Sequence, residues 1–212
     1  PAREVLIAYN TILNTRDKAK AQAIAFDIRE SGRAARDENC KIIRDENGKR
    51  VNVPGLFQHC KAVGWYIDGY DRAQISINLT NYKITPPHLV LDKVRELARE
   101  KGIEVTGSEL VGLLPKAALI ESGKYYLAKM GESTGLPERM VMDTAIQSMG
   151  LAELAPFDLD KKVIEYAIAA KDRLVNLTVT GFIDLLSTDA PAPGGGSVAA
   201  LCGAMSGALS AM

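Results

Sequence analysis

A row of short amide and hydroxyl side chains alternates with apolar residues in the segment RAQISINLTNY (72–82). Successive side chains of a β-strand point to opposite faces, so this polar set would share one face of a sheet. Amides and hydroxyls both donate and accept hydrogen bonds. The pattern favours a face that binds a polar ligand or a second layer, with an ordinary solvated antiparallel face as the alternative. The polar set is Gln74, Ser76, Asn78 and Thr80.

Two further strands are expected to extend this polar face. In EVLIAYNTIL (4–13), the apolar residues of one side leave Asn10 on the polar face. In IEVTGSELVGLL (103–114), alternation after Val105 places Ser108 there as well. The candidate ligand-binding residues are therefore Asn10, Gln74, Ser76, Asn78 and Ser108.

The elements that must position these residues follow the order β-α-β-β-α-β. This order is typical of the split βαβ or ferredoxin-like unit, an α+β fold in which two helices cover one face of a four-stranded sheet. The first and third strands are usually central neighbours, which would bring Asn10, Ser76 and Asn78 together. The expected strands are 4–13, 61–67, 72–82 and 103–114, and the expected helices are 15–32 and 85–102.

Helices dominate the rest of the chain. The sequence predicts helices at 116–130, 137–149 and about 159–170, which complete a first domain at 1–168. A linker at 169–176 and a second helical segment at 177–212 follow. Within the first domain, a polar insert at 33–55 carries Asn47-Gly48 between β-prone runs, which indicates a surface hairpin.

Composition limits the function classes. The 212 residues carry 26 Lys plus Arg and 26 Asp plus Glu, and a balanced charge disfavours a dominant nucleic-acid surface. An RNA-binding sheet would also stack bases on central aromatic residues, and the polar row contains none. Three cysteines without a CxxC pair indicate a reducing, cytoplasmic compartment. We expect neither a signal peptide nor a membrane span.

Reactive side chains are few. His59 and His88 lack partners at metal-ligand spacing, so we expect no metal site. Cys60 follows His59 directly, and adjacent strand residues point apart, which disfavours a Cys-His pair. Trp65 is expected to pack rather than to recognise a ligand. Lys61 is expected to be a solvated or snorkelling side chain, with a functional role as the alternative.

Several stretches resemble a known family. The segments LIAYNTILNT, VGWYIDGYDRAQISINLTNYKITPPH, VTGSELVGLLPKAAL and SMGLAELAPFDLDKKVIEYAI resemble the C-terminal half of the glutamate formiminotransferase domain. TVTGFIDLLSTDAPAPGGGSVAALCGAMSGALSAM resembles the opening of the formiminotransferase-cyclodeaminase partner domain. The resemblance covers almost the whole chain apart from the insert at about 33–55.

The resemblance implies a cytoplasmic enzyme of histidine degradation with tetrahydrofolate as co-substrate and no metal. The formimino group of N-formimino-L-glutamate moves to the folate N5, and a fused cyclodeaminase, an all-α domain, then forms 5,10-methenyltetrahydrofolate and ammonia. It implies that folate lies between two subdomains whose sheets face each other, and that the full-length enzyme is a homo-oligomer. The five candidate residues would then line the folate channel.

The same resemblance places the catalytic groups elsewhere. The family's catalytic histidine belongs to an N-terminal subdomain, and neither His59 nor His88 matches it. The cyclodeaminase aspartate is expected beyond residue 212, so it is assigned to neither Asp184 nor Asp189. The chain is therefore expected to be cut from a longer protein at both ends and to be inactive alone.

Two other function classes are open. The chain could be a non-catalytic ferredoxin-like module that binds a ligand or regulates, and that dimerises through its open sheet face. It could also be an interaction scaffold that uses the small-residue helix at 197–212.

Overall fold

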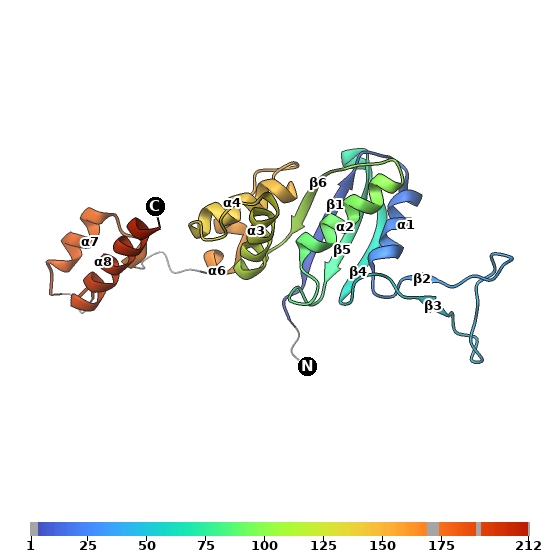
Figure 1. Ribbon diagram of the computed structural model, residues 1–212, viewed down its shortest axis with the longest axis horizontal. Helices are drawn as coiled ribbons and strands as arrows, with labels where there is room; N and C mark the ends of the chain where they lie inside the picture. Colours follow the sequence, from blue (N-terminus) through green and yellow to red (C-terminus); the bar gives the residue numbers. More distant parts are fainter. Residues whose placement is uncertain (1–3, 169–173, 190–191, 212) are drawn as a thin grey trace. The chain divides into compact units, whose positions relative to one another are not determined.

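The computed structural model describes residues 4–168, 174–189 and 192–211. Its main sheet has antiparallel strands in the order β4-β5-β1-β6 (Figure 1). This order places the first and third of the long strands in the middle and confirms the predicted α+β, ferredoxin-like arrangement. The strands are β1 (Ile7–Leu13), β4 (Cys60–Ile67), β5 (Arg72–Leu79) and β6 (Val105–Val111).

Helices α1 (Lys18–Ile28) and α2 (Pro87–Glu100) cover one face of this sheet. Both helices bury the apolar stripe that their sequences predict at 3.6-residue spacing. In α1 the stripe includes Ile24 and Ile28, and in α2 it includes Val90 and Val94. The face between helices and strands is therefore apolar.

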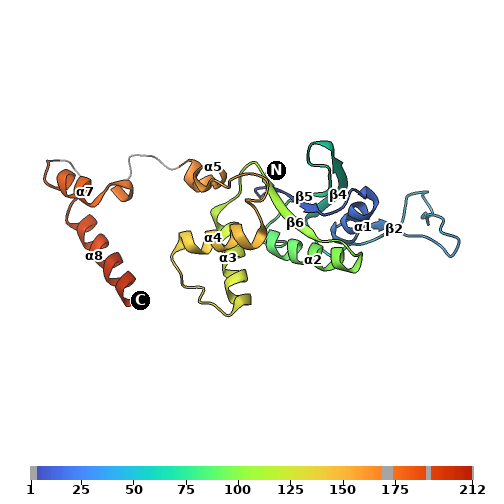
Figure 2. The same cartoon turned by 90° about the horizontal axis from the view of Figure 1, so that it is seen from above.

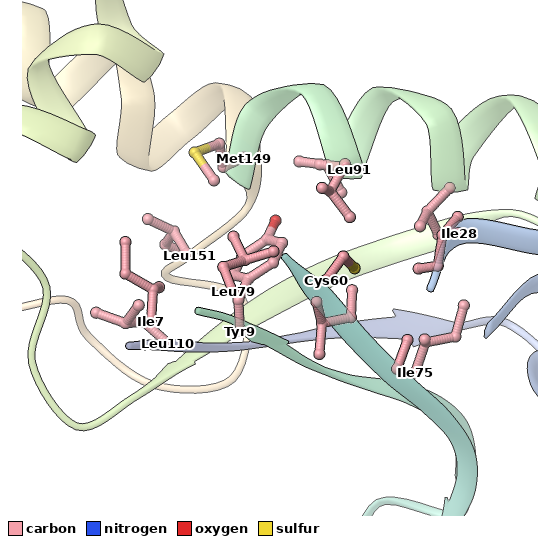
Figure 3. Close-up of a cluster of buried hydrophobic side chains, with 14 of the residues drawn as sticks. Ile7, Tyr9, Ile28, Cys60, Ile75, Leu79, Leu91, Leu110, Met149 and Leu151 are labelled. Carbon is pink, nitrogen blue, oxygen red and sulfur yellow. The ribbon is translucent and has the colours of Figure 1, made fainter. Parts of the chain in front are cut away.

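The core lies between this helical layer and the sheet (Figure 3). Ile7 and Tyr9 from β1 and Ile75 from β5 are fully buried there, as is Leu91 from α2. Burying an aliphatic side chain of this size contributes roughly 1.5–3 kcal/mol. The alternation of each central strand thus commits one of its faces to the core and leaves the other face for polar residues.

Helices α3 (Lys116–Met130) and α4 (Glu138–Met149) pack against each other beyond the sheet (Figure 2). Their backbones approach closely at Gly123, where an added Cβ would lie 2.0 Å from the carbonyl oxygen of Val141. The close approach explains why a residue without a side chain stands in the middle of α3.

The predicted helix at about 159–170 is interrupted, which corrects the sequence prediction. It consists of α5 (Leu159–Lys162) and α6 (Ile164–Ala167). Val163 separates them because it forms a parallel bridge with Leu114. The Leu114 backbone donates to the Lys162 carbonyl at 3.0 Å and accepts from Ile164 N–H at 3.0 Å.

The insert at 33–55 forms an arm that projects from the sheet (Figure 1). Its turn at Gly48, with φ at 74°, agrees with the predicted hairpin. A second turn of the same kind precedes it, with Cys40 at φ 61° in the place of the glycine. Asp37 and Asp45 each accept two backbone N–H groups with their Oδ1 atoms in the same pattern. The short strands of the arm are β2 (Arg33–Ala34) and β3 (Asn52–Val53).

The chain divides into two compact units, Pro1–Ala167 and Ile168–Met212. Most of the linker predicted at 169–176 lies outside the described residues. The described part of the second unit contains a short 3-10 turn and two α-helices, and in the described part of the whole chain no helix is long and apolar enough to cross a membrane. The elements of the second unit are η2 (Leu174–Asn176), α7 (Val179–Leu186) and α8 (Gly195–Ser210).

Candidate functional site

The polar row of β5 lies on the open face of the sheet, which we define as the face opposite α1 and α2. Ile75 and Ile77 are both fully buried on the helix side, so Ser76 and Asn78 between them point away from the helices. Both polar side chains are half-buried. The orientation predicted for the polar row from alternation is confirmed.

Asn10 joins this row from the neighbouring strand. It is the register partner of Ser76, and Ala8 is the register partner of Asn78. Directly opposed residues on antiparallel strands have their Cβ atoms about 4.5–5.5 Å apart. An amide and a hydroxyl therefore stand side by side at the centre of the open face, with the small Ala8 leaving room beside Asn78.

Gln74 also belongs to the open face, but its amide is already engaged. It is only 2% exposed, and its Nε2 donates to Oε2 of Glu109 at 3.4 Å. Glu109 lies on β6 opposite Asn10, so the bond reaches across the central strand β1. A small cavity of about 270 Å³ lined in part by Ile12 and Tyr70 adjoins this end of the face. Glu109 was not among the candidates, although its position beside Asn10 in the register makes it a polar neighbour.

Ser108 lies on the helix side, and the orientation predicted for it was wrong. The register between β1 and β6 shifts after Ile12, so that Thr106 is an extra residue on β6. One inserted residue moves every later side chain of the strand to the other face. Ser108 is fully buried and donates its hydroxyl to the Met149 carbonyl at 2.7 Å, at the C-terminal end of α4. Its observed contact is with the backbone of the helical layer.

The edge strand β4 adds side chains to the open face that the sequence prediction did not include. Trp65 is the register partner of Gln74, Val63 of Ser76 and Lys61 of Asn78. Trp65 is 52% exposed, so the expectation that its ring packs against the described part of the chain is wrong. Gly64 lies on the helix side of β4, because an added Cβ there would lie 2.1 Å from the backbone nitrogen of Gln22 on α1. Its neighbours Val63 and Trp65 therefore lie on the open face. The alternation of small or apolar residues with larger ones in CKAVGWYI (60–67) already indicates that Trp65 faces away from the helices.

The histidine and cysteine most suggestive of chemistry are core residues. His88 is 3% exposed, and its Nδ1 lies 3.0 Å from the Ser122 hydroxyl, which itself donates to the Ala118 carbonyl. His88 must then donate from Nδ1, and burial lowers its pKa to about 4, so that the ring is neutral. Burial raises the pKa of the Cys60 thiol to about 12, which leaves it a poor nucleophile.

A charged cluster on the helix side joins α2 to α3. Asp92 accepts hydrogen bonds from Tyr125 at 2.8 Å, Tyr126 at 3.1 Å and Lys129 at 2.6 Å. Burial acts to raise the pKa of Asp92, and the three hydrogen bonds outweigh it and lower the pKa. Because these donors come from the neighbouring helix and satisfy the carboxylate, the cluster holds the helices together.

The open face can hold a polar, partly flat ligand by hydrogen bonds and by contact with an aromatic surface. It offers donors and acceptors at its centre, a carboxylate at one side and an indole ring at the other edge. Among the described residues there is no cluster of His, Cys, Asp or Glu that could hold a metal ion. The amides, the hydroxyl, the carboxylate and the indole of this face are groups suited to binding such a ligand.

Comparisons with known proteins match both parts of the chain. The family described as Formiminotransferase domain matches residues 8–169, and the family described as Formiminotransferase-cyclodeaminase matches residues 178–212. The formimidoyltransferase-cyclodeaminase of Dictyostelium discoideum is 38% identical over 216 residues, which cover 100% of this chain and 37% of that protein. The mouse protein of the same name is 34% identical over 215 residues, covering 100% of this chain and 36% of its own length.

A shorter match involves a protein with a single activity in its name. The glutamate formimidoyltransferase of Thermoplasma acidophilum is 34% identical over 134 residues, covering 63% of this chain and 37% of that protein. The chain thus spans little more than a third of the length of these curated relatives.

Proposed function

This chain belongs to the formiminotransferase family, and on that premise we propose that its open sheet face is the tetrahydrofolate-binding half of a glutamate formimidoyltransferase. The proposed reaction moves the formimino group from N-formimino-L-glutamate to tetrahydrofolate in histidine degradation. The bond between the formimino carbon and the glutamate nitrogen breaks, a bond to folate N5 forms, and the N5 proton ends on the released glutamate.

The observation that carries this proposal is the pairing of Asn10 with Ser76 at the centre of the open face, next to Asn78. Their amides and hydroxyl are half-buried, where they can both donate to and accept from a ligand. A reduced folate presents ring N–H groups, a carbonyl oxygen and an amide, all of which need such partners. A face intended only for solvent contact would not require a short amide paired with a hydroxyl, and a second amide beside them, at its centre.

The proposed enzyme needs a second wall above this face. We assign that wall, together with the catalytic histidine, to an N-terminal transferase subdomain, since relatives of this chain are almost three times as long. On this proposal the 212 residues alone bind but do not turn over substrate. Residues 178–212 would begin a cyclodeaminase that forms 5,10-methenyltetrahydrofolate and ammonia. The complete enzyme would be a cytoplasmic homo-oligomer.

A second candidate is a ligand-binding or regulatory module that dimerises through the open face. Apolar side chains on that face favour it: Val63 is 45% exposed and Val111 is 50% exposed. In a dimer they would be covered by another copy. Sedimentation of wild type and Val63→Asp without folate distinguishes the two, because only this second candidate requires a dimer that forms through the open face and is lost in the variant.

Turnover by the full-length protein tests the proposal. Formimino transfer to tetrahydrofolate is measured for wild type, Ser76→Ala and Asn78→Ala, with Asn47→Ala on the arm as control. Losing one contact of this kind costs about 0.5–1.5 kcal/mol, so we expect the KM for tetrahydrofolate to rise between about twofold and tenfold in each face variant. The control should behave as wild type. Wild-type values in both face variants would remove the open face from the folate site.

A further inference from the structure

We propose that the open face binds the folate in one direction, with the pterin ring against Trp65 and the glutamyl carboxylates towards Lys61. This inference rests on the proposed function and assigns the parts of the ligand to parts of the site. It follows from three features of the face: an exposed indole, a bridged carboxylate and a lysine at the opposite end of the same edge strand.

Trp65 is the first feature. A tryptophan usually buries most of its ring, yet this one is 52% exposed on the same face as Ser76 and Asn78. Flat aromatic rings stack on such side chains with a contribution that tolerates changes in the stacked ring. Trp65 is also the single tryptophan of the chain. The indole therefore offers the largest flat surface of the open face.

The second feature is the Gln74–Glu109 bridge, which starts on the strand next to that indole and spans β1 to the opposite edge strand. Gln74 is the register partner of Trp65, and its bond to Glu109 draws the carboxylate across β1 towards β5. An ionised carboxylate accepts several hydrogen bonds, and the bond from Gln74 occupies one oxygen. The pterin ring presents a ring N–H and an amino group on one edge. A ring stacked on Trp65 can direct that edge at Glu109, which favours this end of the face for the pterin.

Lys61 is the third feature. It is exposed, pairs with Asn78 in the register and lies four residues before Trp65 on β4. At about 3.3 Å per residue, the two α-carbons are about 13 Å apart. Val63 lies between them on the same face and is 45% exposed. The strand thus presents an aromatic ring, an apolar side chain and a cation in sequence, which matches the pterin, the aminobenzoyl ring and the carboxylates of a folate.

The test compares two ligands that differ in the tail. Affinities for 5-formyltetrahydrofolate and for 6-methyltetrahydropterin, which lacks the aminobenzoyl and glutamyl parts, are measured by anaerobic calorimetry on the full-length protein. The variants are Trp65→Leu, Trp65→Phe and Lys61→Met, and the matched control is Lys41→Met on the arm. Thermal melting confirms that each variant is folded, and Trp65→Phe keeps an aromatic ring in place.

The two variants should affect the ligands differently. Trp65→Leu should weaken both ligands by about fivefold or more, and Trp65→Phe should retain most of the affinity. Lys61→Met should weaken 5-formyltetrahydrofolate about two- to fivefold and leave 6-methyltetrahydropterin unchanged. The control should change neither.

The failures of the two proposals are distinguishable. If wild type binds neither ligand, the proposed function is rejected together with this inference. If wild type binds the folate but not the tetrahydropterin, or if the variants give any other pattern, the direction of binding is overturned while the folate site stands.

Discussion

Ser76 and Asn10 are register partners on the two central strands, and both side chains lie on the sheet face opposite helices α1 and α2. Their immediate neighbours along the chain, Ile75 and Tyr9, are fully buried on the other face. The strand alternation that builds the core therefore also builds the candidate site. A change on one face can be made without disturbing the other, and the predictions below use that separation.

Ser108→Ala should reduce stability and leave folate binding unchanged. The hydroxyl of Ser108 is buried and donates to the Met149 carbonyl at the end of α4. Its loss should lower the free energy of unfolding by about 1 kcal/mol, measured by urea denaturation. Calorimetry with 5-formyltetrahydrofolate should give the wild-type affinity. Weakened folate binding with unchanged stability would return Ser108 to the ligand site.

Asp92→Asn should destabilise the packing of α2 on α3. The variant loses the charge that holds the ammonium group of Lys129 and the hydroxyl groups of Tyr125 and Tyr126. We expect a loss of about 1–3 kcal/mol in the free energy of unfolding at pH 7. Glu96→Gln is the control, because its partner Lys93 forms an ion pair on the surface and such pairs contribute about 0–1 kcal/mol.

The effect of Asp92→Asn should also depend on pH. Burial acts to raise the pKa of Asp92, and its hydrogen bonds act more strongly to lower it. The folded pKa therefore lies below the unfolded value of about 3.9. The contribution of the carboxylate is present above that unfolded value and is lost as the pH falls through the folded pKa. The difference between wild type and variant should therefore shrink from pH 7 to pH 3. A difference that stays constant would contradict the role of the charge.

His88→Asn should flatten the dependence of stability on pH between about 4 and 6.5. Burial lowers the pKa of His88 to about 4, whereas the unfolded value is about 6.5. The unfolded chain binds the proton first, so wild type loses stability as the pH falls through this window. The Asn amide can still donate to Ser122. Urea denaturation at several pH values measures the slope, and an equal slope in both proteins would show that His88 is not the titrating group.

Gly64→Ala should be strongly destabilising, although the residue lies on an edge strand. The new methyl group would meet the backbone nitrogen of Gln22 at 2.1 Å, and a backbone atom cannot move aside without shifting α1. We expect a loss of about 3 kcal/mol or more in the free energy of unfolding. Gly69→Ala is the matched control, because nothing lies within 4 Å of its added Cβ. Equal melting temperatures for the two variants would contradict the close packing of α1 on β4.

Much of the fold and half of the open face could be predicted from the sequence. The order of strands and helices and the polar row of β5 follow from alternation and helical spacing, which are local patterns. Asn10 follows as well, because the ferredoxin-like order makes β1 and β5 neighbours. These features depend on short segments and on one topological rule.

The missed features depend on contacts between segments that are distant in the chain. The bulge at Thr106 arises from the pairing of β6 with β1. Gly107 indicates that this strand can bend, but the sequence does not show which residue is inserted, and simple alternation therefore puts Ser108 on the wrong face. The bridge from Gln74 to Glu109 requires both registers at once. Trp65 was assigned to packing because tryptophan usually packs, although alternation with Gly64 already indicated its side.

The most direct test of the central claim is a crystal structure of the full-length protein with 5-formyltetrahydrofolate. The ligand is predicted to lie on the open face, with polar atoms within about 2.5–3.5 Å of the Ser76 hydroxyl and the Asn78 amide. A ligand bound on the helix side of the sheet, or an open face covered by a second copy of the chain with the folate elsewhere, would contradict it.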